Sequence, residues 1–132
     1  EFDARLILKN SMTPLIKKIL DTDKEIIAST SYLPINLNPV FSNVRWLYCI
    51  PKYPCALSDL NFSNLTNFYG YSNHCDDIIA PLTASILGAN LIEIHITSDK
   101  TKDFFDNNVS FDYSELTQLM KYIRTSSQIK HD

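Results

Sequence analysis

The 132-residue chain lacks several features that would assign it to a familiar class of protein. It has no run of basic residues and a formal net charge of −3, which argues against a nucleic-acid-binding surface. No apolar stretch approaches the roughly 20 residues that cross a bilayer, and no signal peptide is recognisable. The composition therefore predicts a protein that binds neither nucleic acid nor membrane.

Cysteine is scarce and irregularly spaced. The three cysteines, Cys49, Cys55 and Cys75, are odd in number and form no CxxC pair. This pattern argues against a disulfide framework and against a zinc ribbon, and it suits the reducing cytoplasm, which is the expected location. The hydrophobic content of 45% is enough for a packed core, and the length is that of one ordinary domain.

Helical and strand-like segments alternate along the chain. Helices are predicted from Thr13-Pro14 onward, over 76–88, and after a capping box at Asp112 and Glu115. Apolar strands are predicted over 24–31, 44–50, 67–72 and 91–97, with a loop over 31–43. This order is typical of an α/β fold with about four parallel strands and flanking helices.

Two histidines follow neighbouring strands of this predicted sheet. His74 ends the segment Gly70-Tyr71-Ser72-Asn73-His74, and His95 lies in Leu91-Ile92-Glu93-Ile94-His95-Ile96-Thr97. One helix separates them, so both should lie at the same edge of a parallel sheet. Two imidazoles there could bind Mn, Zn or Fe and leave positions for substrate. The alternative, that each histidine is structural, remains open.

Four segments carry a further similarity: Tyr53-Pro54, the segment ending in His74, the stretch 84–97, and the ending Phe105-Asp106-Asn107-Asn108-Val109-Ser110. Together they resemble the sialic acid (N-acetylneuraminate) synthase family. It implies a (β/α)8 TIM barrel, of which residues 1–132 would be a partial domain, the C-terminal half. A full barrel needs about 250 residues.

The resemblance also implies an activity. The family condenses phosphoenolpyruvate with an N-acetylated amino sugar such as N-acetylmannosamine in nonulosonate biosynthesis. It implies a divalent metal, Mn²⁺ or Mg²⁺, bound by His74 and His95, with His95 and Tyr53 as catalytic residues. Ser29, Ser72, Tyr53 and Asp106 would bind the substrates.

Two other interpretations remain open. Pro51 stands where the family usually has Asn, and Asn73 stands where it usually has Asp, so the chain could be a degenerate barrel domain that binds a sugar or a partner without turnover. Another metal-dependent barrel, such as a sugar isomerase, would explain the histidines but not the Tyr-Ser-Asn-His segment. A half-barrel would also expose its inner face, so the chain is expected to form a homodimer or to pair with the other half of its barrel.

Overall fold

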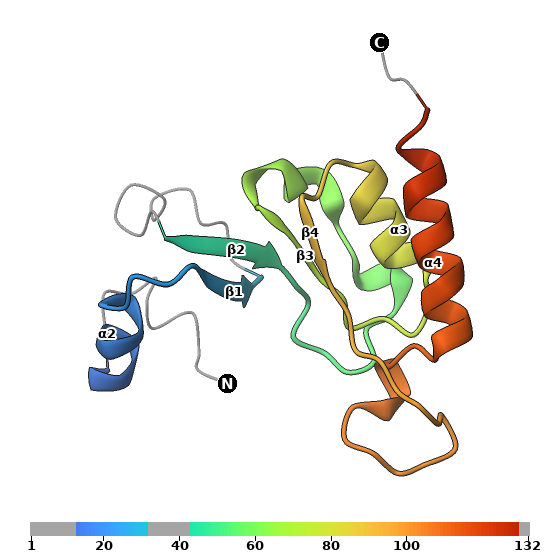
Figure 1. Ribbon diagram of the computed structural model, residues 1–132, viewed down its shortest axis with the longest axis horizontal. Coiled ribbons are helices and arrows are strands. Elements are labelled where there is room, and N and C mark those ends of the chain that lie inside the picture. The colour runs from blue at the N-terminus through green and yellow to red at the C-terminus, as the bar shows by residue number, and fades with distance from the viewer. Residues whose placement is uncertain (1–12, 32–42, 130–132) are drawn as a thin grey trace.

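The computed structural model of the protein describes residues 13–31 and 43–129. Most of the loop expected over 31–43 lies outside these residues. The described part contains helices, strands and short 3-10 turns in alternation (Figure 1): α2 (Pro14–Leu20), β1 (Ile26–Thr30), β2 (Val44–Tyr48), η1 (Leu57–Asp59), η2 (Phe62–Asn67), β3 (Gly70–Ser72), α3 (Ile79–Ile86), β4 (Leu91–Glu93), η3 (Asn107–Val109) and α4 (Tyr113–Ser126).

The strands form one four-stranded parallel sheet in the order β1-β2-β3-β4. Neighbours in the chain are therefore neighbours in the sheet, as in a sector of a (β/α)8 barrel. The predicted α/β class with four parallel strands is confirmed. Among the described residues no helix combines the length and the hydropathy that a membrane span requires.

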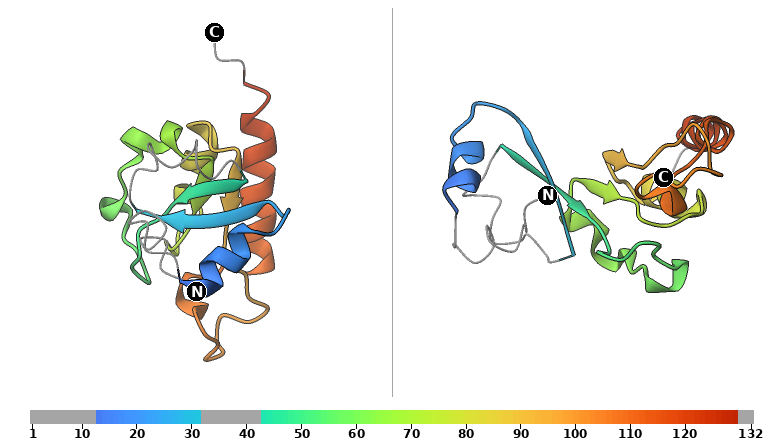
Figure 2. Two further views of the ribbon diagram at one scale, coloured as in Figure 1. Left: turned by 90° about the vertical axis from the view of Figure 1, so that its left-hand side faces the viewer. Right: turned by 90° about the horizontal axis from the view of Figure 1, so that it is seen from below.

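One face of the sheet carries the core. Ile26 and Ala28 of β1, Trp46 and Tyr48 of β2 and Tyr71 of β3 belong to one buried cluster. Helix α2 packs on it through Ile16, and α3 packs on it through Ala80 and Ala84. The helices accordingly cover opposite ends of the sheet, α2 beside β1 and β2, and α3 with α4 beside β3 and β4 (Figures 1 and 2).

The opposite face is the one that a complete barrel would enclose. The register aligns Ser29 with Leu47, Leu47 with Gly70, and Ser72 with Glu93. Parallel partners share a face, so these residues all point away from the helices. The apolar run Ile26-Ile27-Ala28 within 24–31 predicts a buried strand. This prediction is wrong at Ile27, which is 50% exposed, because burial alternates along β1.

Helices α2 and α4 begin as the sequence predicts. The Thr13 hydroxyl accepts a hydrogen bond from the Ile16 N–H, and Pro14 occupies the first turn. In α4 the Asp112 carboxylate accepts a hydrogen bond from the Glu115 N–H, and the Glu115 carboxylate accepts one from the Asp112 N–H. The predicted capping box is confirmed.

Helix α3 is shorter than the predicted 76–88. The Asp77 carboxylate accepts from the Ile79 N–H where the helix begins, and Gly88 ends it with a φ of 95°. The sequence predicts that this helix buries its large apolar residues, Ile78, Ile79, Leu82, Ile86 and Leu87. This prediction is wrong in part, because Ile79, Ile86 and Leu87 are between 45% and 50% exposed, and the small residues Ala80 and Ala84 face the sheet.

Strands β3 and β4 are also shorter than predicted. Residues 62–67 form the 3-10 turn η2, and β3 begins only at Gly70. A β-carbon at Gly70 would stand 2.0 Å from the Leu91 carbonyl oxygen, so only glycine lets these strands approach. Strand β4 ends at Glu93, and among the described residues beyond it one isolated parallel bridge joins Ile96 and Phe111.

Candidate functional site

Backbone hydrogen bonds fix both histidines just beyond the C-terminal ends of β3 and β4. The Asn73 N–H donates to the Glu93 carbonyl, which carries the ladder one residue past β3. The His74 carbonyl then accepts from the Cys55 N–H, and the His95 carbonyl accepts from the Phe111 N–H. The backbone of each histidine is thus tied to a segment far away in the sequence.

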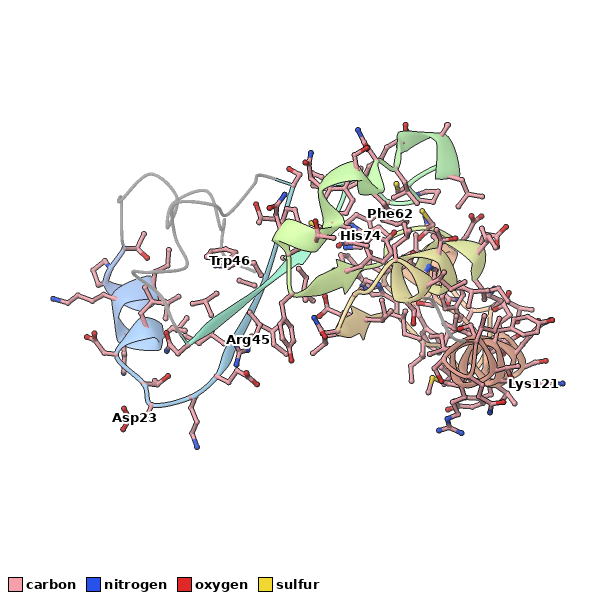
Figure 3. All side chains as sticks on the ribbon, turned by 90° about the horizontal axis from the view of Figure 1, so that it is seen from above. Asp23, Arg45, Trp46, Phe62, His74 and Lys121 are labelled. Atoms are coloured by element: carbon pink, nitrogen blue, oxygen red, sulfur yellow. The ribbon has the colours of Figure 1, made fainter. Side chains whose placement is uncertain are left out.

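Three rings gather at this edge of the sheet. The imidazoles of His74 and His95 lie 5.9 Å apart between ring centroids. The phenol ring of Tyr53 stacks on His74 at 4.0 Å and meets the edge of His95 at 5.9 Å. His74 lies in the middle of the molecule in the view of Figure 3, between the labelled Trp46 and Lys121. The strand ends therefore bring together the three residues that the sequence analysis selected.

The hydrogen-bond network of His74 defines the tautomer of its neutral ring. Its Nδ1 lies 2.6 Å from the Ile50 carbonyl oxygen, and its Nε2 lies 2.7 Å from the Tyr53 hydroxyl oxygen. A carbonyl oxygen can only accept, so Nδ1 carries the proton and Nε2 carries the lone pair. A histidine whose far nitrogen donates to a backbone carbonyl is oriented as metal-binding histidines are.

His95 has a different environment. Its Nδ1 is buried and has no hydrogen-bond partner among the described residues. Its Nε2 lies 3.8 Å from a carboxylate oxygen of Asp106, too far for a hydrogen bond but close enough for electrostatic attraction to a protonated ring. Asp106 adopts a left-handed backbone conformation, with φ of 56°, that aspartate tolerates better than most residues.

The two candidate phosphate-binding serines share one face of the sheet but differ in burial. Ser29 is exposed, one residue before the end of β1, and Ser72 is buried at the end of β3. The register places Ser72 in the row of Glu93, two residues further toward the histidine edge than the row of Ser29. Ser72 is therefore the serine nearer to the level of the rings.

A buried polar network next to His74 was not predicted from the sequence. The Asn73 side-chain oxygen accepts from the Tyr71 hydroxyl at 3.1 Å, and its amide donates to the Cys75 carbonyl at 2.7 Å. Burial, reinforced by the neighbouring Cys75 thiol, raises the pKa of Tyr71, and burial likewise raises the pKa of Cys55 to about 12. In the sequence, the uninterrupted polar run 72–74 at a strand end was the feature that could have indicated this network.

The donor set suits a cation that keeps open coordination positions. Among residues 13–31 and 43–129 no three His, Cys, Asp or Glu side chains cluster closely enough to hold a metal by themselves. Two imidazoles, one already oriented by a carbonyl, would leave the remaining positions to water or substrate, which is typical of a catalytic metal site. The residues present thus fit a divalent metal.

Comparison with known proteins identifies the family. Residues 8–132 match the model of the NeuB family, and the chain belongs to that family. The resemblance to sialic acid synthases is therefore confirmed.

Individual relatives agree with this assignment. The chain is 31% identical, over 84% of its length, to an N,N'-diacetyllegionaminic acid synthase of Campylobacter jejuni. It is 26% identical, over 98%, to a pseudaminic acid synthase of that species. It superposes with a TM-score of 0.78 and 25% identity on a sialic acid synthetase from Leptospira borgpetersenii solved with citrate, covering 95% of this chain.

The match is confined to part of each relative. The chain spans 39% of both Campylobacter synthases and 48% of the Leptospira chain. It therefore corresponds to less than half of the enzymes it resembles.

Proposed function

We propose that this chain supplies the metal-binding part of the active site of a nonulosonate synthase. The proposed reaction condenses phosphoenolpyruvate with an N-acetylated amino sugar such as N-acetylmannosamine. The observation that carries the proposal is the gathering of Tyr53, His74 and His95 at the C-terminal ends of β3 and β4, in a chain of the NeuB family. In parallel α/β folds this edge is where active sites lie.

His74 and His95 would hold the cation, which we propose to be Mn²⁺ or Mg²⁺. When bound, a divalent cation polarises a carbonyl oxygen as a Lewis acid, here the aldehyde of the acceptor sugar. The Ile50 carbonyl keeps the His74 ring oriented with its lone pair toward the site. Asp106, 3.8 Å from His95, would accept hydrogen bonds from sugar hydroxyl groups.

Other residues at this edge would hold the remaining substrate groups. The half-exposed Tyr53 would donate its hydroxyl proton to the sugar. The hydroxyl groups of Ser29 and Ser72 lie on the sheet face that points away from the helices, and we propose that they donate to the phosphate of phosphoenolpyruvate. The lysines of this chain are not needed for this role, because hydroxyl and backbone N–H donors can bind phosphate.

The decisive experiment measures metal binding and turnover in the full-length protein. Mn²⁺ binding is followed by electron paramagnetic resonance, and turnover by phosphate release from phosphoenolpyruvate with N-acetylmannosamine. His74→Ala and His95→Ala should each weaken Mn²⁺ binding at least tenfold and abolish turnover, because each removes a ligand. His131→Ala is the matched control, since His131 has no part in the proposal.

The outcomes separate the two interpretations of the domain. Metal-dependent phosphate release that both variants lose supports the synthase. Binding of the sugar without any release of phosphate would instead favour a non-catalytic sugar-binding domain. Undiminished Mn²⁺ binding by both histidine variants would rule out the proposed metal site.

A further inference from the structure

The side chains of Tyr53 and His74 are in direct contact through both a hydrogen bond and ring stacking. The Tyr53 hydroxyl oxygen lies 2.7 Å from Nε2 of His74, and the two rings stack with an interplanar angle of 27°. The two residues come from different segments, Tyr53 after β2 and His74 after β3. The phenol therefore occupies the side of the imidazole that faces the proposed site.

The nitrogen that Tyr53 contacts is the one that could bind a metal. Nδ1 of His74 must donate to the Ile50 carbonyl, so the neutral ring has one lone pair available, on Nε2. With Nδ1 protonated, the Tyr53 hydroxyl oxygen, 2.7 Å from Nε2, is placed to donate its proton to that lone pair. One lone pair cannot accept this proton and bind a cation at the same time.

From this competition we infer that Tyr53 controls access of the cation to His74. In the structure the phenol hydroxyl covers Nε2. Metal loading requires the hydroxyl to leave, and the released hydroxyl is then available to the acceptor sugar. The inference rests on the proposed function, because it takes His74 as a metal ligand.

The surroundings of Tyr53 allow this movement. Tyr53 is 39% exposed, and the neighbouring residues from Pro51 to Pro54 are all exposed, so displacement of the phenol breaks no core packing. His74 itself is 6% exposed and is fixed through its backbone and its Nδ1. The tyrosine is therefore the partner that moves.

Tyr53 affects the metal affinity of His74 and not that of His95. The ring of Tyr53 meets His95 edge-on at 5.9 Å between centroids, whereas its hydroxyl oxygen lies 2.7 Å from Nε2 of His74. Replacing Tyr53 should therefore change the metal affinity through His74 and leave the environment of His95 almost unchanged.

The test compares Tyr53→Phe with the wild type in the full-length protein. Phenylalanine keeps the stacked ring and removes the hydroxyl, so Nε2 no longer has to give up this hydrogen bond when the cation binds. Electron paramagnetic resonance should show Mn²⁺ binding about threefold to tenfold tighter in the variant. Tyr113→Phe, on the exposed start of α4, is the matched control and should leave the affinity unchanged.

A second readout follows the phenol directly. Mn²⁺ should change the near-ultraviolet absorption of tyrosine in the wild type and in Tyr113→Phe, and this change should be absent in Tyr53→Phe. Two results together would refute the inference about Tyr53 and still support the metal site. These are unchanged or weaker Mn²⁺ binding by Tyr53→Phe, and loss of Mn²⁺ binding in His74→Ala. Undiminished binding by His74→Ala would instead refute the metal site and the inference together.

Discussion

Asn73 shows how a fully buried residue next to His74 can support the candidate site. It is fully buried between Tyr71 and Cys75 and hydrogen-bonds to both. A neutral amide suits this place better than a carboxylate, because it can donate to the Cys75 carbonyl while it accepts from the Tyr71 hydroxyl. Asn73 also directly precedes His74, so its hydrogen bonds help to position the backbone from which the His74 ring extends.

Replacing Asn73 by alanine should destabilise the protein. The change leaves the Tyr71 hydroxyl and the Cys75 carbonyl buried without this partner, which costs about 1–3 kcal/mol. Urea unfolding followed by circular dichroism measures the loss. Asn108→Ala, at an exposed position of η3, is the control and should stay within about 0.5 kcal/mol of the wild type. Equal effects of the two changes would refute the role of the network.

The buried thiols and Tyr71 should make stability fall in alkali. Burial, and then the hydrogen-bonded Cys75 thiol, raise the pKa of Cys55 from 9.0 to about 12, and the pKa of Tyr71 rises for similar reasons. The unfolded chain therefore loses these protons first. The stabilisation from the protonated groups is complete below about pH 9 and is lost as the pH rises toward 12.

Unfolding in urea at a series of pH values from 7 to 11 checks this expectation. The free energy of unfolding should decline above about pH 9, and Cys55→Ala should decline less steeply. The comparison uses the slope with pH, because the smaller side chain also costs packing energy at every pH. A variant with the wild-type slope would show that Cys55 does not titrate with folding.

The position of the two histidines could be predicted from sequence, but their partners could not. Parallel strands end at one edge of a sheet, so residues at the ends of two neighbouring strands must be near each other. The contact of Tyr53 with His74 depends on the path of the exposed segment after β2, and no sequence period describes that path. The approach of Asp106 to His95 depends on one left-handed residue in a loop, which is equally invisible in a pattern.

Among the helices and strands, α4 is the one whose stability depends most clearly on the hydrogen bonds of its first turn. It is the longest described helix and presents Leu119 to the core, with most of its other side chains exposed. Its capping box binds backbone N–H groups that would otherwise lack partners. Glu115 also pairs with Lys100 at 2.5 Å, which ties the helix start to the loop after β4.

Removing the N-terminal cap of α4 should lower the free energy of unfolding by about 1 kcal/mol. Asp112→Ala deletes the oxygen that accepts from the Glu115 N–H, whereas Asp112→Asn keeps an acceptor at the same place. Thermal or urea unfolding should therefore place the asparagine variant near the wild type and the alanine variant clearly below it. An alanine variant as stable as the asparagine variant would contradict the importance of the cap.

The elements that the sequence predicted well are those with local signals. Thr13-Pro14, the Asp112–Glu115 pair and Gly88 mark helix ends by the geometry of a few neighbouring residues. The buried side of α3 was predicted wrongly because its large apolar residues are not the ones that face the sheet. Close packing on β3 and β4 selects Ala80 and Ala84, and this preference comes from the partner strands and not from α3 itself.

At the scale of the whole molecule, one face of the sheet is covered and the other is partly open. In the described part of the chain β1 and β4 are the end strands of the sheet. The face turned away from the helices exposes half of Ile27 as well as Ser29 and Glu93. In a closed barrel the missing strands would pair with both end strands and cover this face.

We therefore expect the 132-residue polypeptide, expressed by itself, to self-associate. Burial of apolar surface is worth roughly 25 cal/mol per Å², so a few hundred Å² of shared sheet face would favour association at micromolar concentration.

Ile27→Lys should weaken this association, because it puts a charge on the open face. Leu15→Lys is the matched control: Leu15 is 61% exposed, but it lies on α2 and not on the sheet face. Sedimentation velocity measures both variants. A stable, well-folded monomer, or equal effects of the two lysines, would show that the open face does not need a partner, and a self-contained binding domain would then be the better account of this chain.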